Sequence, residues 1–303
     1  MTTHEHDHAH QSFGQNKMAL TLALSITTIM MLVEFVGGWL SNSLALISDA
    51  GHMLTDTGSL ALALLALWFS RRPATTKNTY GFYRTEILAA LLNGSLLIVI
   101  AGYIFYSAIQ RLIAPSAVIG PLMLIVAVVG LVANLLGAFI LSHGSKDNLN
   151  VRAALWHVLS DTISSIGVIL GGLIITFTGY TLVDPIIGFL IGVIILRGAI
   201  RIFKEAIDIL LEATPAGIKQ EEVAKAMQSV VGVSEVHDLH IWSITSGMIA
   251  LSAHVLIRDT LVSKCGEVSK TLKDILKSQF RITHATLEFE CEKCLDGQAC
   301  NIK

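Results

Sequence analysis

Six long apolar stretches fill most of this 303-residue chain before about residue 205 and restrict what it can fold into. A helix needs about 20 mostly apolar residues to cross the hydrocarbon core of a bilayer. The stretches that qualify are Met18–Leu40, Leu44–Phe69, Ile87–Ile109, Ala117–Leu141, Val151–Phe177 and Ile186–Phe203. Only 15% of all residues are charged, well below the roughly 25% of soluble domains. We therefore predict an α-helical membrane protein with six transmembrane helices.

Lysine and arginine are distributed unevenly among the connections between these spans. The basic connections hold Arg71, Arg72, Lys77 and Arg84 (second), Lys146 and Arg152 (fourth), and Arg201 and Lys204 (after the last span). The first connection has no charge, and the third and fifth hold only Arg111 and Asp184. Because basic loops stay in the cytoplasm, both termini are predicted to be cytoplasmic. The short loops suit a prokaryotic plasma (inner) membrane.

After Pro215 the sequence reads as a small folded domain. The expected order is helix Ile218–Val231, strands Glu235–Ile244 and Met248–Ile257, helix Leu261–Phe280 and strand Ile282–Glu290. In the first strand His237, Leu239 and Ile241 alternate with the other residues. This αββαβ order predicts a two-layer α+β domain of ferredoxin-like kind, lying in the cytoplasm. The expected organisation is a His-rich tail over 1–16, a transport domain over 17–208, the cytoplasmic domain over 209–290 and a Cys-containing tail over 291–303.

Two His-x3-Asp pairs lie inside the apolar stretches: His52 with Asp56, and His157 with Asp161. Residues four apart share one helix face, with about 6 Å between their Cβ atoms, so each pair presents an imidazole beside a carboxylate. Facing one another, the two pairs would form a tetrahedral site that zinc accepts. Ionisable groups at membrane depth are expensive and usually mark an ion pathway. The pattern predicts metal transport through a His₂Asp₂ site.

Proton exchange follows from the charges of these four side chains. Two carboxylates balance one Zn²⁺, and after zinc leaves they balance two protonated imidazoles, so either cargo gives a neutral site. Metal binding requires deprotonated ligands and therefore releases protons. We accordingly expect zinc/proton antiport, with Zn²⁺ and H⁺ as the transported partners. The net charge of −2 and the lack of a basic stripe predict no nucleic-acid partner.

Other polar residues in the spans have two readings. Asp49 lies three residues before His52 on the same helix face, where it can act as a relay or entrance carboxylate, or simply form hydrogen bonds. Glu34, Asn93, Asn134 and Ser164 are interpreted as interhelical hydrogen-bonding groups.

Other functions would require different sequence motifs. An intramembrane metalloprotease needs a His-Glu-x-x-His helix within the membrane. That spacing occurs only at His4-Glu5-His6-Asp7-His8, in the polar N-terminal tail and outside the apolar stretches, so we predict no enzyme. A metal sensor or scaffold would have little need for two complete intramembrane pairs, although it could keep the cytoplasmic domain. Two imidazoles favour zinc over manganese; cadmium, cobalt and iron remain alternatives.

Several segments resemble the cation diffusion facilitator family over nearly the whole chain. The second span, from Ser43 through His52 to Asp56, resembles the signature segment of that family, and His157-Val158-Leu159-Ser160-Asp161 is similar to its counterpart. The segment Tyr80–Glu86 resembles the entry to the third span. The resemblance implies a homodimer, alternating access driven by inward proton flow, and a transport site of His52, Asp56, His157 and Asp161. Its closest likeness is to bacterial zinc exporters. The loop 70–79 lacks Asp and His, so the further metal site of some members is not expected there.

The same resemblance implies a regulatory zinc site in the cytoplasmic domain. His237, His254 and Glu290 match the positions of zinc ligands in related transporters, and His284 matches less closely because its spacing to the final Glu differs by one. His240 is a further candidate. Cys291-x2-Cys294, followed by Cys300, lacks the second pair that closes a four-cysteine site and could borrow nearby histidines. Cys265 is expected to be a small apolar residue, and the histidines at 4, 6, 8 and 10 either capture metal or belong to a solvated tail.

Overall fold

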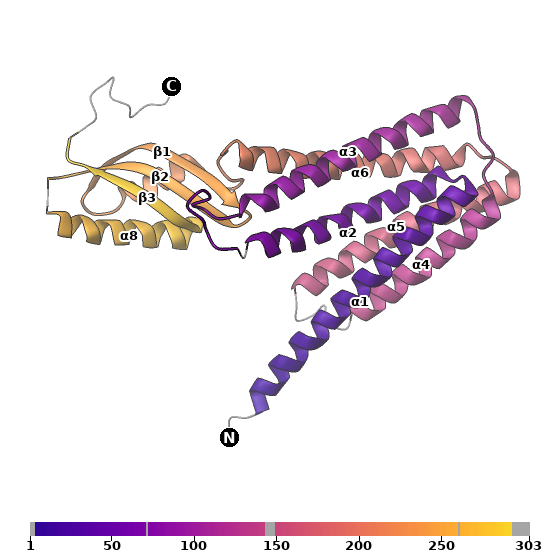
Figure 1. Cartoon of the computed structure of the whole chain (residues 1–303), viewed down its shortest axis with the longest axis horizontal. Helices are drawn as coiled ribbons and strands as arrows, with labels where there is room; N and C mark the ends of the chain where they lie inside the picture. The colour runs from indigo at the N-terminus through magenta and orange to yellow at the C-terminus, as the bar shows by residue number, and fades with distance from the viewer. Residues whose placement is uncertain (1–3, 71, 143–148, 260, 293–303) are drawn as a thin grey trace. The chain divides into compact units, whose positions relative to one another are not determined.

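The computed structural model describes residues 4–70, 72–142, 149–259 and 261–292. It contains eight helices and three strands over those residues. The elements, in chain order, are α1 (His4–Ser41), α2 (Leu44–Ser70), α3 (Arg84–Ile113), α4 (Gly120–Ser142), α5 (Leu149–Thr178), α6 (Val183–Leu210), α7 (Gln220–Gln228), β1 (Val233–Thr245), β2 (Met248–Ile257), α8 (Val262–Phe280) and β3 (Ile282–Glu290) (Figure 1). They form two compact units: Met1–Leu64 with Leu92–Ile202, and Leu65–Leu91 with Phe203–Lys303.

The first unit is a helical membrane domain. Among the described residues, five helices are long and apolar enough to cross a membrane: Leu24–Ser41, Arg84–Ile113, Gly120–Ser142, Val158–Thr178 and Val183–Leu210. Their outward faces carry large apolar side chains, such as Phe177 at 82% exposure, which suits a lipid solvent. Five of the expected spans are thereby confirmed. The sixth, α2, includes side chains outside the described part of the chain and stays a prediction.

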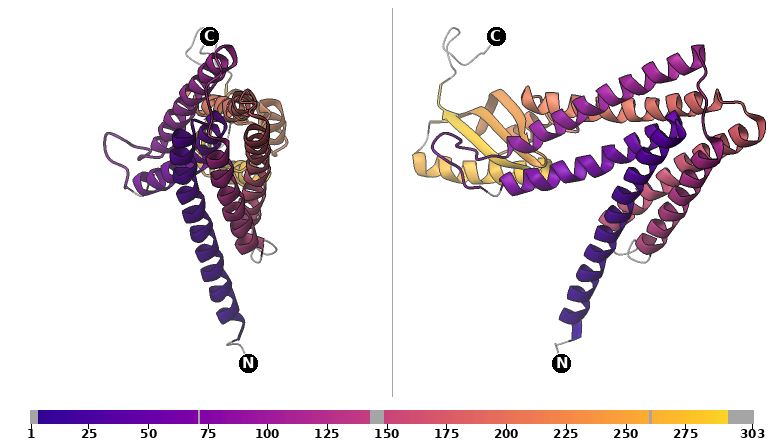
Figure 2. Two further views of the ribbon diagram at one scale, coloured as in Figure 1. Left: turned by 90° about the vertical axis from the view of Figure 1, so that its right-hand side faces the viewer. Right: turned by 45° about the vertical axis from the view of Figure 1, so that its right-hand side comes forward.

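Apolar side chains from five helices meet in the core of this unit. Leu46 on α2, Leu97 and Ile104 on α3, Met123 on α4 and Ile195 on α6 are almost completely buried. Val168 contributes from α5. Helix α4 packs against α1 and α5, and the three lie side by side in both figures (Figures 1 and 2). This packing fixes α2 and α5, the helices that carry the two His-x3-Asp pairs.

The second unit confirms the αββαβ order. Its three strands form one sheet in the order β1-β2-β3, with β1 and β2 antiparallel and β2 and β3 parallel. Helix α8 makes the crossover that a parallel pair requires. The helices pack on one face of the sheet through Met227, Leu251, Leu272 and Leu276, so the domain is a two-layer fold consistent with the ferredoxin-like class.

Strict alternation along β1 was a wrong expectation. The register slips between His237 and His240, where Asp238 has a positive φ of 46°. This β-bulge inserts an extra residue and reverses the side-chain pattern. Leu239 and Ile241 therefore point into the core together with Val236, while His237 lies on the opposite face of the sheet. The bulge turns His237 towards the open face that carries the site described below.

Candidate metal centres

Helices α2 and α5 run past one another with polar side chains facing across the contact. His52 Nε2 lies 3.6 Å from Asp161 Oδ1. One turn away, the Ser164 hydroxyl donates a hydrogen bond of 2.6 Å to Asp49 Oδ1. Moving three residues forward on α2, from 49 to 52, corresponds to three residues back on α5, from 164 to 161. The two helices are therefore antiparallel and in register at this depth.

The other two predicted ligands follow along the same register. Asp56 is four residues beyond His52 on α2, and His157 is four residues before Asp161 on α5. Their backbones belong to described helices, whereas their side chains lie outside the described part of the chain. Asp161 is 2% exposed and His52 is partly buried, so this pair lies within the protein rather than at its surface.

The remaining polar residues of the spans differ in whether they form hydrogen bonds. Asn134 on α4 donates to the Ser165 hydroxyl on α5 at 3.3 Å, and Ser164 binds Asp49, so the hydrogen-bonding interpretation is confirmed for both Asn134 and Ser164. Asn93 is buried on α3. Glu34 on α1 differs: it is 1% exposed, and its Oε2 atom has no hydrogen-bond partner among the described residues.

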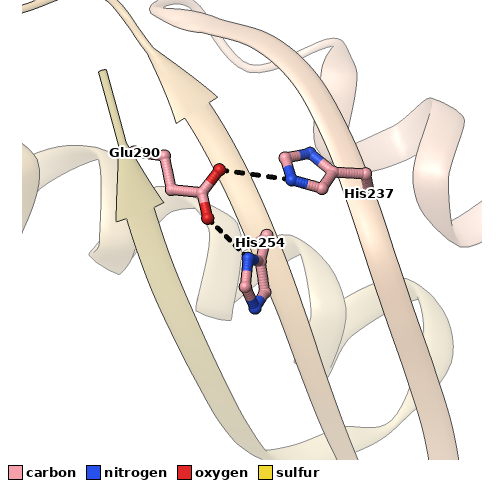
Figure 3. A group of neighbouring side chains, drawn as sticks. All are labelled: His237, His254 and Glu290. Carbon is pink, nitrogen blue, oxygen red and sulfur yellow. Dashed lines mark hydrogen bonds and ion pairs between the residues drawn. The ribbon is translucent and has the colours of Figure 1, made fainter. Parts of the chain in front are cut away.

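A second cluster lies on the open face of the sheet. His237, His254 and Glu290 each offer a ligand atom, and these atoms all lie within 4.8 Å of one another. His237 Nε2 is 3.2 Å from Glu290 Oε2, and His254 Nδ1 is 2.5 Å from Glu290 Oε1 (Figure 3). Two imidazoles and a carboxylate at these distances make up a donor set that zinc accepts, with a fourth coordination position left for another ligand.

The strand register explains why these three side chains meet. His237 pairs directly with His254 across β1 and β2. On β3, Glu290 is next to Leu256, two residues from His254 on the same face of β2. Core residues at Val255 and Phe289 point the other way, because successive side chains of a strand alternate between faces.

Acidic neighbours surround the outer nitrogen of His254. Asp238 Oδ2 and Glu288 Oε2 each lie 3.6 Å from His254 Nε2. His240 Nε2 is 2.9 Å from Asp238 Oδ1, so His240 is tied to this rim rather than to the three-residue cluster. Sequence patterns did not single out Asp238 or Glu288. Their role depends on the bulge at Asp238 and on the pairing of His254 with Glu288.

Among the described residues, no other predicted cytoplasmic ligand joins this three-residue cluster. His284 pairs with Ala250 near the start of β3, and its ring contacts Tyr80 at 5.8 Å between centroids. Six residues of strand, about 20 Å, separate it from Glu290. Cys265 packs against the core as a small apolar residue, as expected. Cys291 is exposed with a free thiol just after β3. Cys294, Cys300 and the side chains of His4, His6, His8 and His10 lie outside the described part of the chain.

Asp184 forms a further buried polar centre that the sequence did not single out. It is completely buried at the start of α6 and accepts hydrogen bonds from the Ser43 hydroxyl at 2.6 Å, Leu44 N at 2.7 Å and Ala45 N at 3.1 Å. Arg111 Nη1 lies 3.4 Å from Asp184 Oδ2, the oxygen that also accepts from Leu44 N. The carboxylate thus caps the first turn of α2, eight residues before His52, and links it to α3.

Family and sequence comparisons agree over most of the chain. A family model for a cation efflux transmembrane domain matches residues 20–211, and one for a cation efflux protein cytoplasmic domain matches residues 215–292. The metal cation efflux system protein CzcD of Cupriavidus metallidurans is 44% identical, covering 98% of this chain and 92% of its own length.

Two further relatives cover a similar share. A cadmium, cobalt and zinc/H(+)-K(+) antiporter of Bacillus subtilis is 41% identical over 92% of this chain and 90% of its own length. The zinc transporter ZitB of Escherichia coli is 40% identical over 99% of this chain and 95% of its own length. All three align with both units of the chain.

Proposed function

This chain belongs to the cation diffusion facilitator family of metal cation efflux transporters, and we propose that it is a zinc/proton antiporter. It is a multi-pass membrane protein rather than an enzyme. Zn²⁺ would leave the cytoplasm by alternating access through His52, Asp56, His157 and Asp161. The proposed location is the plasma (inner) membrane, with both termini in the cytoplasm, and the proposed assembly is a homodimer.

The contact between His52 and Asp161 is the main structural support. It joins one member of each His-x3-Asp pair at 3.6 Å across two different helices. The register continues by the same four-residue step to positions 56 and 157, so the backbone can bring all four side chains within one helical turn of each other. A zinc ion would then receive two imidazole nitrogens and two carboxylate oxygens, a tetrahedral set.

Proton coupling is supported by the charge of this set. With zinc bound, two ionised carboxylates offset the two charges of the metal. After release, two protons on the imidazoles offset the same carboxylates, because histidine titrates near pH 6.5 when unperturbed. A neutral site in both states avoids the large free-energy cost of an uncompensated charge in a low-dielectric environment. The family resemblance to an antiporter of cadmium, cobalt and zinc fits this exchange.

Zinc flux into proteoliposomes under an imposed pH gradient tests the proposal. We expect zinc uptake into vesicles with an acidic lumen, falling to the leak rate when a protonophore collapses the gradient. The gradient drives uptake because protons leaving the lumen exchange for entering zinc. Cadmium, cobalt and iron in place of zinc give the selectivity. Zinc binding by purified protein without any gradient-driven flux would contradict antiport and favour a sensor.

The cytoplasmic cluster is proposed to bind a regulatory zinc ion. His237, His254 and Glu290 supply three donors, and acidic neighbours add negative charge that favours a cation. The match to a cation efflux cytoplasmic domain model supports assembly of two protomers through this part of the chain. Metal bound there would bias the inward-open or outward-open state by binding one of them more tightly.

Replacing His254 tests this second site. We expect His254→Ala to remove about one zinc ion per protomer from the full-length protein, because it deletes one of three donors. Equilibrium dialysis followed by metal analysis measures the change. His284→Ala is the matched control, since His284 lies at the far end of β3 and should leave zinc content unchanged. Equal zinc content in wild type and His254→Ala would refute the site.

A further inference from the structure

The two ring nitrogens of His254 face different carboxylates. Nδ1 lies 2.5 Å from Glu290 Oε1, and the other oxygen of Glu290 contacts His237. Nε2 lies 3.6 Å from both Asp238 Oδ2 and Glu288 Oε2. In Figure 3 this second nitrogen points away from Glu290 and His237. A neutral imidazole binds metal through one nitrogen and carries its proton on the other, so the orientation of the ring decides which atom a metal meets.

The geometry of the cluster selects Nδ1 as the ligand atom of His254. Zinc shared by His237, His254 and Glu290 would lie among donor atoms that are within 4.8 Å of one another. Nδ1 is beside the Glu290 carboxylate, which is also 3.2 Å from His237 Nε2. With Nδ1 bound to zinc, Nε2 carries the proton of the ring. The carboxylates around Nε2 therefore face a proton rather than the metal.

Asp238 is the better placed of the two carboxylates near Nε2. Its side chain is 21% exposed, whereas that of Glu288 is 69% exposed. Water and salt weaken the charge interactions of an exposed group, so Asp238 acts more strongly on Nε2 than Glu288 does. The other oxygen of Asp238, Oδ1, accepts a hydrogen bond of 2.9 Å from His240 Nε2. This bond fixes the direction of the carboxylate.

The bulge in β1 brings this carboxylate to the site. In a regular strand the side chain that follows His237 would point to the opposite face of the sheet. Here the register slips between His237 and His240, and Asp238 adopts a left-handed φ of 46°. Leu239 takes the place in the core, and Asp238 contacts His254 on the open face. Aspartate, asparagine and glycine adopt this backbone conformation more readily than other residues.

We propose that Asp238 is a positioning residue of the regulatory zinc site: its carboxylate keeps the proton of His254 on Nε2 and so directs Nδ1 to the metal. This inference rests on the zinc site proposed for His237, His254 and Glu290. A carboxylate behind a metal-bound histidine fixes the ring and raises the basicity of the ligand nitrogen, and its loss weakens metal binding about 10–100-fold. His240 supports Asp238 from the outside and takes no direct part in metal binding.

Competition for zinc between the full-length protein and a chromogenic chelator tests this role. The affinity of interest is that of the zinc ion which His254→Ala removes. We expect Asp238→Gly to weaken it about 100-fold, and Asp238→Asn about 10-fold because asparagine keeps an oxygen that accepts from Nε2–H. Both variants tolerate positive φ and keep the bulge, and at saturating zinc both should hold as many zinc ions as wild type. Asp274→Asn, at an exposed acid on α8, is the matched control and should keep wild-type affinity.

A double variant shows whether Asp238 acts through His254. Asp238→Asn added to His254→Ala should change zinc binding no further, because the ring to be positioned is gone. An additional loss of zinc in the double variant would overturn the role. Wild-type affinity in Asp238→Gly would also overturn it, because glycine keeps the bulge and removes only the carboxylate. A lower zinc count at saturation in either Asp238 variant would make Asp238 a direct ligand and overturn the role as well.

Failure of the positioning role differs from failure of the zinc site itself. Equal zinc content in wild type and His254→Ala would remove the site and this inference with it. Loss of zinc in His254→Ala together with wild-type affinity in Asp238→Gly would remove only the positioning role. Circular dichroism and gel filtration verify that each variant is folded, and Asp238→Asn supplies an independent answer if Asp238→Gly fails to fold.

Discussion

Asp161→Ala is expected to reduce gradient-driven zinc flux at least about 100-fold. Asp161 is 2% exposed, contacts His52 across the α2–α5 boundary and belongs to the proposed transport site. Alanine removes a ligand and one of the two charges that balance zinc at the transport site. The remaining ligands would hold an ion with net positive charge in an apolar environment, which is strongly unfavourable. Initial rates in proteoliposomes with an acidic lumen measure the effect.

A neighbouring serine provides the control for this variant. Ser160 precedes Asp161 on α5 and is exposed, and its hydroxyl donates a hydrogen bond within the helix to the Trp156 carbonyl oxygen. Ser160→Ala should retain wild-type flux. Asp161→Asn keeps the size of the side chain and removes its charge, so it should be as inactive as alanine if charge balance matters. Flux above about half the wild-type rate in either Asp161 variant would refute the proposed transport site.

Periodicity predicted the elements of the cytoplasmic domain well. The bounds expected for the second and third strands, Met248–Ile257 and Ile282–Glu290, coincide with β2 and β3, and α8 begins one residue after its expected start. Both strands are flanked by unmistakable turn or helix signals, such as Gly247 with φ of 76°. Five of the expected membrane helices were equally recognisable, because about 20 apolar residues have few other uses in a chain.

Side-chain direction was harder to predict than the elements themselves. A one-residue slip reverses every side chain in a strand, so the bulge at Asp238 decided whether His237 would join the core or the open face. Nothing in the sequence from Val236 to Ile241 marks that bulge. The meeting of His237 with Glu290 also depends on the parallel pairing of β2 and β3, which joins residues far apart in the chain.

In the intramembrane site, too, the local pattern was predictable and the contacts between helices were not. The His-x3-Asp spacing placed each pair on one helix face, a local property that sequence can show. Which residue of α5 faces His52 is set by how α1, α4 and α5 pack, and the spacing alone could not supply it. Asp184 was overlooked for this reason, because the groups that it binds lie in the first turn of α2, on another helix.

Asp184→Ala is expected to lower the free energy of unfolding by about 3–5 kcal/mol, as does removing one partner of a buried ion pair. Alanine would leave the Ser43 hydroxyl, the Leu44 and Ala45 amides and the Arg111 guanidinium without the acceptor they now share. Arg111 would keep its bonds to Asn42, at 2.6 Å to the backbone oxygen and 3.0 Å to Oδ1, so the loss would centre on the start of α2. Thermal unfolding in detergent should show Tm lower by about 10 °C, given roughly 2–4 °C per kcal/mol for a chain of this size.

Two comparisons identify the cause of that loss. Asp184→Asn keeps one acceptor oxygen and should lower Tm by an intermediate amount, whereas Asp208→Ala, an exposed acid on the same helix, should leave Tm unchanged. Because the capped turn precedes His52 by two helical turns, its loss also frees α2 to shift relative to α5. Zinc flux per folded protomer should therefore fall in Asp184→Ala even below its melting temperature. A Tm within about 1 °C of wild type would show that this carboxylate does not anchor α2.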